Sequence, residues 1–548
     1  MLKNRCLLIP AIKKNAVIPD QLVKKLAGKT LIARALETAL GVVPAENVIV
    51  VTDCDEIRLI CERAGVGCFY DAAFNIRKLD IVSSLRPILE RLAGEYEHII
   101  IYRASAPLVT SSDIEDAYNS FISSEGDCLV TVKNLRYRLW QDRGKSLDAL
   151  LFNEEKQDVY AETKSLVMLK SSSLADAARN TAAGTKAVPY FMHDRGIEIT
   201  SYLDWWVCEK ILQSRHIVFV VAGYPAIGMG HVSRALMFAH EIADHRVTFL
   251  CTKESELAAA NIAARDYRTV VQQSEDLAAE VLRQKPDLVI NDMLDTSGSY
   301  MAALKKASVA VVNFEDEGEG AASADLVVNA LYSGSGSGHS LYGYKYFCLR
   351  DEFLQARRNV FRHKAKRLLI TFGGTDDSDY TRQCLATLWP LCRENGIEIR
   401  IVAGPGYAHK DSLSAYIEAL SGSREIPSPD LSFTHATNVM SKEMENADMA
   451  VCSAGRTVYE LAHMRIPAIV LAHNERETNH RFARAANGFV YLGLMRDFSV
   501  GKLAKAFNRL LEPEYRHLLF SRQDRFDFSP NKSRVVKTML GLLQKESV

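Results

Sequence analysis

A glycine turn between a buried strand and a helix is the most chemically suggestive segment of this chain. The segment reads IVFVVAGYPAIGMGHVSRALMFAHEI and starts at Ile217. Gly228 and Gly230 let a ligand approach the backbone, and the helix that begins with His231 offers free N–H groups and a positive dipole end to an anion. Arg234 lies in the first turn of that helix. His231 is placed for a general base because imidazole titrates near neutral pH, although a plain structural turn with a surface histidine has the same pattern.

Two later loops repeat this design. In AVCSAGRTVYELAHMRIPAIVL, a strand leads into Ser453, Ala454 and Gly455, and a helix from about Arg456 carries Glu460 one turn further on. Small residues with exposed amides suit a diphosphate, and the carboxylate could accept hydrogen bonds from ribose hydroxyls. ITFGGTDDSD, residues 370–379, is the third loop. Ligands gather at the carboxyl ends of parallel strands, so three such loops favour a site over three simple strand ends.

The elements that must position these loops form three series of short buried strands alternating with amphipathic helices. This pattern predicts an α/β chain with three parallel sheets. Breaks near residues 212–216 and near Phe361 predict domains at 1–213, 214–362 and 363–548. The flexible stretch SGSGSGHS, residues 333–340, is either a linker or, as we favour, a loop beside the cleft. The expected strands are residues 6–11, 48–53, 98–104, 128–133 and 165–169, then 217–223, 247–251, 288–292, 309–314 and 326–330, then 367–373, 398–404, 431–434, 449–455 and 468–473.

Composition excludes several classes of protein. The 548 residues include 67 Lys and Arg against 67 Asp and Glu, which argues against a protein that coats nucleic acid or binds membranes through a polybasic surface. The 11 cysteines form no C-x-x-C pair and are typical of buried thiols in a reducing cytosol. No signal peptide and no apolar window of membrane-spanning length is visible. We therefore expect a soluble cytoplasmic protein with neither nucleic-acid nor membrane partners.

The motifs of the C-terminal two thirds carry a family resemblance. IGMGHVSRAL, ITFGGTDDSD and AVCSAGRTVYELAHMRIPAIVL, followed by HNERETNH, together resemble the UDP-sugar hydrolase of pseudaminic acid biosynthesis and its spore-coat polysaccharide relatives, in the GT-B group that includes MurG. The resemblance spans residues 217–543 and implies a GT-B module of two Rossmann-like lobes. It implies release of UDP from a 2,4-diacetamido-2,4,6-trideoxyhexose nucleotide by inverting attack of water at the anomeric carbon.

The same resemblance implies roles for individual residues. His231 would be the base, Glu460 would hold the ribose, and residues 474–479 would face the sugar. No metal is implied because helix termini would stabilise the departing UDP. Position in the chain, and not the resemblance, makes Asp292 and Asp316 the best candidates for sugar contacts, because each stands at a strand end; the other acidic residues there are Asp295, Glu315, Glu317 and Glu319. The remaining substrate- and nucleotide-binding candidates are Gly228, Gly230, Arg234, Gly373, Gly374, Thr375, Ser453, Ala454, Gly455, Arg456, Thr457, Asn474 and Asn479.

Two features depart from that family. Arg456 stands where the family often has a glycine, so its guanidinium could clamp the diphosphate or obstruct the pocket. The segment HNERETNH replaces a shorter A-x-N-Q ending. Both departures leave the identity of the sugar open.

The N-terminal third is similar to CMP-sialic acid synthetases and related cytidylyltransferases. CLLIPAIKKNAVIPDQLVKKLAGKTLIARALETAL, VIVVTDCDEI and IIIYRASAPLVTSSDIEDA carry the likeness, over residues 5–210. It implies a Rossmann-like nucleotidyltransferase domain that binds CTP or a CMP-sugar and, by analogy, forms a homodimer.

The chemistry of that family is only partly retained. The phosphate loop lacks the family's paired glycines, although Lys13, Lys14 and Lys24 could still attract phosphate. Arg103 and Ser105 lie in a changed Q-P-T-S-P motif, and the D-I-D metal motif is reduced to Glu198 with Thr200, a weak site for the Mg²⁺ that an active domain would need. A scaffolding, sensing or oligomer-forming role is therefore favoured over CMP transfer.

The leading hypothesis is thus a UDP-sugar hydrolase fused to a cytidylyltransferase-like domain, serving nonulosonic-acid or related surface-glycan precursor supply. Two alternatives stay open at this point. A GT-B glycosyltransferase would use the same UDP-sugar, since His231 could deprotonate an acceptor hydroxyl instead of water. A non-catalytic regulator would only bind nucleotide sugars.

Overall fold

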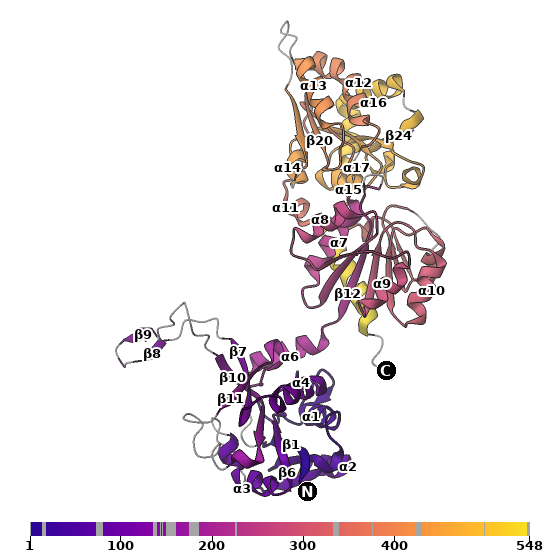
Figure 1. Cartoon of the computed structure of the whole chain (residues 1–548). Coiled ribbons are helices and arrows are strands. Elements are labelled where there is room, and N and C mark those ends of the chain that lie inside the picture. The colour runs from indigo at the N-terminus through magenta and orange to yellow at the C-terminus, as the bar shows by residue number, and fades with distance from the viewer. Residues whose placement is uncertain are drawn as a thin grey trace. The chain divides into compact units, whose positions relative to one another are not determined.

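The computed structural model describes most of the chain, which forms two units, Met1–Ser214 and Arg215–Val548 (Figure 1). The described residues are 2–13, 18–72, 81–134, 140–142, 144, 146–149, 160–174, 186–224, 227–332, 339–374, 376–421, 430–437, 439–497 and 499–544. Within SGSGSGHS, residues 333–338 lie outside this set. No helix among the described residues is both long enough and apolar enough to cross a bilayer.

The first unit is built on a seven-stranded mixed sheet in the order β11-β7-β10-β6-β1-β4-β5. β10 pairs antiparallel with both β6 and β7, whereas the other pairs of this sheet are parallel, so the parallel sheet expected for this series is wrong at β10. The strands are β1 (Lys3–Ala11), β4 (Val48–Thr52), β5 (Gly67–Tyr70), β6 (Tyr96–Tyr102), β7 (Cys128–Asn134), β10 (Tyr160–Lys170) and β11 (Ala187–Phe191).

Helices cover both faces of this sheet. Apolar side chains of α1 (Leu31–Leu40), α2 (Asp55–Ala64), α4 (Ser111–Ile122) and α6 (Tyr202–Gln213) pack in one core cluster, and those of α3 (Ile81–Ala93) pack in another. Thr110 and Asp113 form a capping box at the start of α4, which satisfies two orphan backbone donors there.

The first lobe of the second unit holds a seven-stranded parallel sheet in the order β14-β13-β12-β15-β16-β17-β18. Its strands are β12 (His216–Val221), β13 (Arg246–Cys251), β14 (Thr269–Val271), β15 (Leu288–Asp292), β16 (Ala310–Phe314), β17 (Leu326–Asn329) and β18 (Ser340–Tyr342). α7 (Gly230–Glu241) and α8 (Glu256–Ala263) cover one face, and α9 (Leu277–Arg283) and α10 (Gly298–Lys306) cover the other.

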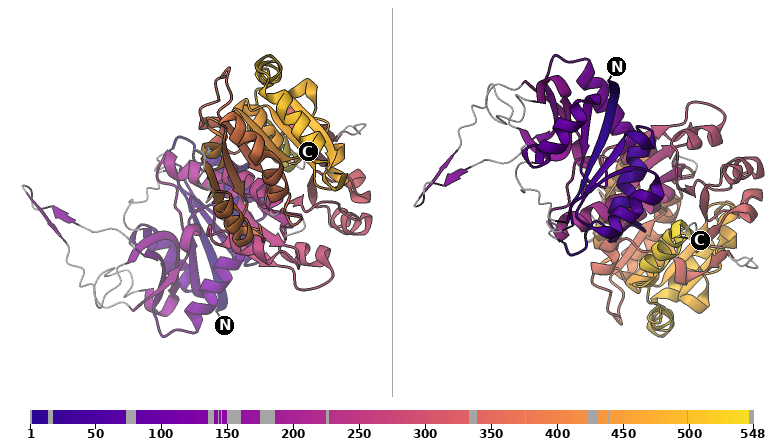
Figure 2. Two further views of the ribbon diagram at one scale, coloured as in Figure 1. Left: turned by 90° about the horizontal axis from the view of Figure 1, so that it is seen from above. Right: turned by 90° about the horizontal axis from the view of Figure 1, so that it is seen from below.

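The second lobe holds a six-stranded parallel sheet in the order β21-β20-β19-β22-β23-β24, with helices on both faces (Figure 2). Its strands are β19 (Arg367–Thr371), β20 (Glu398–Ala403), β21 (Leu431–His435), β22 (Met449–Ser453), β23 (Ala468–Ala472) and β24 (Phe489–Leu494). Its helices are α11 (Asp351–Gln355), α12 (Tyr380–Asn395), α13 (Lys410–Ser421), α14 (Met440–Met444), α15 (Thr457–Met464), α16 (Val500–Leu511) and α17 (Pro513–Gln523).

The predicted fold class is confirmed: an α/β first unit is followed by a module of two Rossmann-like lobes, the GT-B plan. Each expected strand overlaps an observed one. The site loops follow from the strand order, because β12 lies between β13 and β15 and β19 lies between β20 and β22. At both positions the winding of the sheet reverses, and the turns after β12 and β19 are where such sheets bind ligands.

The two lobes exchange segments across the boundary expected between residues 362 and 363. Phe347 and Phe353 pack in the core of the second lobe. The last long helix, α18 (Asn531–Gly541), returns to the first lobe, where it is the yellow helix in Figure 1. Its Val535 and Met539 are fully buried in the core of that lobe. The polypeptide therefore crosses between the lobes twice.

Candidate functional site

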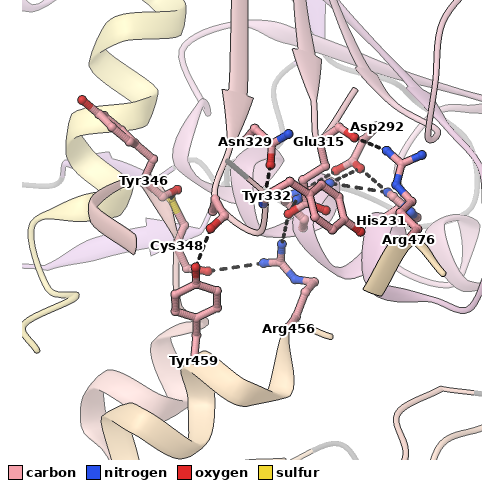
Figure 3. Close-up of polar contacts among 12 residues, drawn as sticks. His231, Asp292, Glu315, Asn329, Tyr332, Tyr346, Cys348, Arg456, Tyr459 and Arg476 are labelled. Carbon is pink, nitrogen blue, oxygen red and sulfur yellow. Dashed lines mark hydrogen bonds and ion pairs between the residues drawn. The ribbon is translucent and has the colours of Figure 1, made fainter. Parts of the chain in front are cut away.

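His231 lies at the start of α7 and is held by a carboxylate at the end of β15. Its Nδ1 is 2.6 Å from Oδ1 of Asp292, and its side chain keeps 11% exposure (Figure 3). Burial would raise the pKa of Asp292, but Arg234 and His231 lower it, so this carboxylate is ionised and can only accept hydrogen bonds. Nδ1 of His231 must then donate, which leaves Nε2 as the nitrogen that can take a proton.

Arg234, one turn along α7, fixes the same carboxylate. Its Nε lies 2.7 Å from Oδ2 of Asp292 and its Nη2 lies 2.6 Å from Oδ1. This two-point bond holds Asp292 in one orientation. Sequence reasoning placed Asp292 and Arg234 among substrate contacts; in the structure both are buried and bond to each other, and Asp292 bonds to the imidazole, which they orient.

Glu315 is a buried member of this cluster that sequence reasoning did not single out. It follows β16 with a positive φ of 53°, and its side chain forms an ion pair with Nη1 of Arg234. Its Oε1 also lies 3.6 Å from Nη1 of Arg456, which comes from the second lobe (Figure 3). Burial would raise the pKa of Glu315, but the two arginines and His231 lower it. Glu315 and Arg234 are therefore both charged.

Asp316, favoured over Glu315 by its position, has another task. Its oxygens accept hydrogen bonds from the backbone nitrogens of Thr296 and Gly318, from the Thr296 hydroxyl at 2.6 Å and from Asn313 at 2.6 Å. A carboxylate with these partners ties the loop after β16 to the loop after β15.

Glycine turns from the two lobes meet beside His231. A Cβ atom built on Gly374 would lie 3.2 Å from the backbone nitrogen of Met229, and one built on Gly230 would lie 3.3 Å from Cδ of Arg456. Gly228 and Gly373 have positive φ values of 75° and 83°, which favour glycine. The structure thus brings the three predicted glycine loops together.

Two helix N-termini face this meeting point without side-chain caps. The N-cap residues are Met229 for α7 and Arg456 for α15, and neither side chain bonds to its helix. Uncapped N–H groups and two positive dipole ends make a ready anion site. Ser453 ends β22, Ala454 and Gly455 lie in the turn that follows, and Thr457 is the first residue of α15.

Two groups beneath this turn, the half-buried Glu477 and the fully buried His480, were not singled out from the sequence, although Glu477 lies within residues 474–479, which were expected to face the sugar. A Cβ on Gly455 would lie 3.6 Å from Oε1 of Glu477, whose other oxygen accepts the backbone N–H of His473 at 2.7 Å. Burial raises the pKa of Glu477. The His480 ring donates from Nδ1 to the Ala454 carbonyl at 2.8 Å, and burial lowers its pKa to about 4. HNERETNH supplies both groups, so the departure from the family pattern was itself the signal.

The other predicted C-terminal residues lie around this centre with separate contacts. Glu460 accepts a hydrogen bond from Nη2 of Arg350 at 3.3 Å. Asn474 is exposed and accepts the backbone N–H of Glu477, and Asn479 is exposed. Thr375 lies outside the described residues.

In the first unit, three predicted residues form one polar cluster. Oε1 of Glu198 accepts hydrogen bonds from Nε of Arg103 at 2.9 Å and from the Ser105 hydroxyl at 3.1 Å. A Mg²⁺ ion on Glu198 would have to displace a guanidinium, and Thr200 uses its hydroxyl on Asp204. Among the described residues, no group of three or more His, Cys, Asp or Glu side chains could hold a metal ion. This donor set does not fit Mg²⁺.

The lysines proposed for CTP phosphates are differently placed. Lys13 forms an ion pair of 2.8 Å with Asp20, and its backbone N–H donates to Asp53. Lys24 is exposed, and Lys14 lies outside the described residues.

Comparisons with curated proteins match both parts of the chain, although no family model does. The uncharacterized protein MJ1062 of Methanocaldococcus jannaschii is 27% identical over 277 residues, which are 47% of this chain and 56% of that protein. The spore coat polysaccharide biosynthesis protein SpsG of Bacillus subtilis is 25% identical over 52% of this chain and 84% of its own length. The pseudaminic acid cytidylyltransferase of Campylobacter jejuni is 25% identical over 33% of this chain and 77% of its own length. Both predicted resemblances are confirmed.

Solved structures give more distant similarities. MurG of Acinetobacter baumannii is 17% identical with a TM-score of 0.44, over 60% of this chain and 99% of that one. CMP:2-keto-3-deoxy-manno-octonic acid synthetase, complexed with CTP, is 14% identical with a TM-score of 0.31, over 38% of this chain and 98% of that one. The fold assignment therefore rests on the sheets themselves.

Proposed function

We propose that residues 215–548 hydrolyse a UDP-sugar, releasing UDP and a free 2,4-diacetamido-2,4,6-trideoxyhexose for surface-glycan synthesis of the nonulosonic-acid type. The observation that carries this proposal is the bond between His231 Nδ1 and Asp292 beside two uncapped helix N-termini. Asp292 fixes the tautomer, so Nε2 takes the proton of a water molecule that attacks the anomeric carbon. The likeness to SpsG supports a role in polysaccharide synthesis.

The diphosphate would lie between the starts of α7 and α15. There the helix N–H groups and Arg456 stabilise the negative charge that develops on UDP as the glycosidic bond breaks. Attack by water from the opposite face inverts the anomeric carbon. Glu460 is our proposed partner for the ribose hydroxyls, and the HNERETNH segment is proposed to face the sugar.

The test is UDP release from a UDP-2,4-diacetamido-2,4,6-trideoxyhexose by the full chain in H₂¹⁸O. We expect UDP without an added acceptor, ¹⁸O on the anomeric carbon of the free sugar, and an inverted anomer by NMR. His231→Gln should lower turnover by about 10² to 10⁴-fold, the usual worth of a general base. His240→Gln is the matched control, because His240 is exposed at the far end of the same helix.

Other results would point to the alternatives. UDP release that requires an added acceptor would identify a glycosyltransferase. UDP binding without turnover of any sugar tested would indicate a regulator.

For the first unit we infer that CMP transfer has been lost and that a binding or scaffolding role remains. The bonds of Arg103 and Ser105 to Glu198, in place of a carboxylate pair, support this inference. Pyrophosphate release from CTP with a nonulosonic acid and Mg²⁺ would contradict it.

A further inference from the structure

Glu315 stands between the base of the first lobe and the arginine of the second. Arg234, which orients Asp292, forms an ion pair with its carboxylate, and Nη1 of Arg456 lies 3.6 Å from the same oxygen. The ion pairs thus run from His231 through Asp292, Arg234 and Glu315 to Arg456. Figure 3 labels His231, Asp292, Glu315 and Arg456 along this path. This path joins the start of α7 to the start of α15.

The middle of the path is buried, and the charges of the path balance. Asp292, Arg234 and Glu315 are 1%, 4% and 5% exposed. Two carboxylates offset two guanidinium groups, so the cluster is neutral when the imidazole is neutral. Electrostatic interactions are strong in such a dry environment, and a change of partner at one end alters the bonds at the other.

Arg456 is the loosely held member of the path. Its contacts with Glu315 and with the Cys348 carbonyl measure 3.6 and 3.5 Å, whereas Arg234 bonds Asp292 at 2.6 and 2.7 Å. Charge-assisted hydrogen bonds of this type are normally about 2.7 to 2.9 Å long. Burial and the nearby Arg234 lower the pKa of Arg456, so its charge is incompletely compensated. An anion at the start of α15 would be a better partner than Glu315.

We propose that Glu315 is a positioning residue that couples diphosphate binding at Arg456 to the orientation of the His231 imidazole. This inference rests on the proposed binding of a UDP-sugar between the two lobes. When the diphosphate binds Arg456, Glu315 pairs with Arg234 alone and draws that guanidinium toward itself. Asp292 then shares less of its charge with Arg234 and binds Nδ1–H of His231 more tightly. The His231 imidazole is thereby oriented as the general base when the diphosphate of the leaving group is bound.

In the experiment, UDP is titrated into the whole chain, in which the histidines carry ¹⁵N. Calorimetry gives the affinity, and the imidazole ¹⁵N signals of His231, assigned by their loss in His231→Gln, report its hydrogen bonding. In the wild type we expect UDP to move these signals. Glu315→Gln should bind UDP about fivefold more tightly, since Arg456 has lost a competing partner, and the imidazole response should be at most half of the wild-type response. A purely structural role would weaken binding instead.

Two further variants sharpen the test. Glu315→Asp keeps the charge but is too short to reach both arginines, so it should also lose the imidazole response. This variant provides the test should Glu315→Gln fold poorly. Glu317→Gln is the matched control, because its carboxylate lies near Arg476 at 4.0 Å and is no part of the path. It should respond to UDP as the wild type does.

The outcomes separate this inference from the proposed function. If Glu315→Gln and Glu315→Asp bind UDP and their His231 signals move as in the wild type, the coupling is wrong and the nucleotide site stands. If the wild type does not bind UDP, both the proposed function and the proposed coupling are wrong.

Discussion

At the scale of single residues, the turn that faces the proposed diphosphate depends on a histidine that must stay neutral. His480 is fully buried, donates from Nδ1 to Ala454, and has no partner for Nε2 among the described residues. Burial lowers its pKa from 6.5 to about 4. The folded state therefore binds fewer protons than the unfolded chain between these values. Stability from this group is present above pH 6.5 and is lost as the pH falls toward 4.

This predicts an acid-dependent loss of stability that one substitution removes. When the pH is lowered from 7.5 to 5, we expect His480 to lower the free energy of unfolding, measured by urea denaturation, by about 2 kcal/mol. His480→Gln keeps a donor for Ala454 and cannot titrate, so its pH dependence should be flatter by that amount. His435→Gln, at an exposed position of β21, should keep the wild-type dependence. Equal slopes in the wild type and His480→Gln would show that the buried ring is not the cause.

Residue types and spacing predicted much of the site, and backbone geometry decided the rest. His231, Arg234, Asp292 and Arg456 were identified from motifs and do lie together. Asp316 was preferred to its neighbour Glu315 because it was placed at the end of the strand. Glu315 has a positive φ and pairs with Arg234, whereas Asp316 bonds to Thr296 and Asn313, and sequence does not reveal such a backbone angle.

At the scale of elements, the glycine loops work only if their backbones can approach one another. Gly404, after β20, would place a Cβ 2.5 Å from both Cα and O of Gly374. The loop it supports lies against Met229 at the start of α7. Gly404 was seen in the sequence only as the end of a strand, because a close approach between two loops leaves no local pattern.

We therefore expect Gly404→Ala to displace the loop at residues 373–374. The clash is with backbone, so it should lower the free energy of unfolding by about 1 to 3 kcal/mol, and the shifted loop should weaken UDP binding measured by calorimetry. Gly501→Ala is the control: a Cβ at this position in α16 would have its nearest contact at 3.9 Å, and alanine favours the helix. Wild-type UDP affinity in Gly404→Ala would show that the loop does not contribute to the nucleotide site.

Most of the predicted strands have buried cores, although β21, which was also predicted, is only partly buried. Strands such as β12 and β22 are buried at every position, and their apolar runs were visible in the sequence. β11 and β14 were missed because they are only partly buried, with alternating or intermediate exposure. The antiparallel direction of β10 was missed because strand direction depends on tertiary pairing, which a short apolar run does not encode.

At the scale of the whole molecule, the second unit is held together by contacts that cross its two lobes. α18 follows the second lobe in sequence but buries Val535 and Met539 in the core of the first. The ring of Phe347 stacks on that of Tyr459 in α15, with 4.1 Å between the ring centroids. Nη1 of Arg476 donates a hydrogen bond of 2.8 Å to Oδ2 of Asp295. Composition and strand spacing predicted two lobes in series and could not show this exchange, since an amphipathic helix does not specify which sheet it covers.

Because the lobes share α18, we expect them to lose stability together. Met539→Ala removes a fully buried side chain and should lower the free energy of unfolding by about 2 to 5 kcal/mol. Hydrogen exchange followed by mass spectrometry should then show reduced protection in β12 of the first lobe and in β22 of the second by similar amounts. Met539→Leu, which nearly conserves volume, should change both much less. Loss of protection confined to β12 would mean that the lobes unfold separately, and that the ion pairs between Glu315 and Arg456 do not unite them into one cooperative unit.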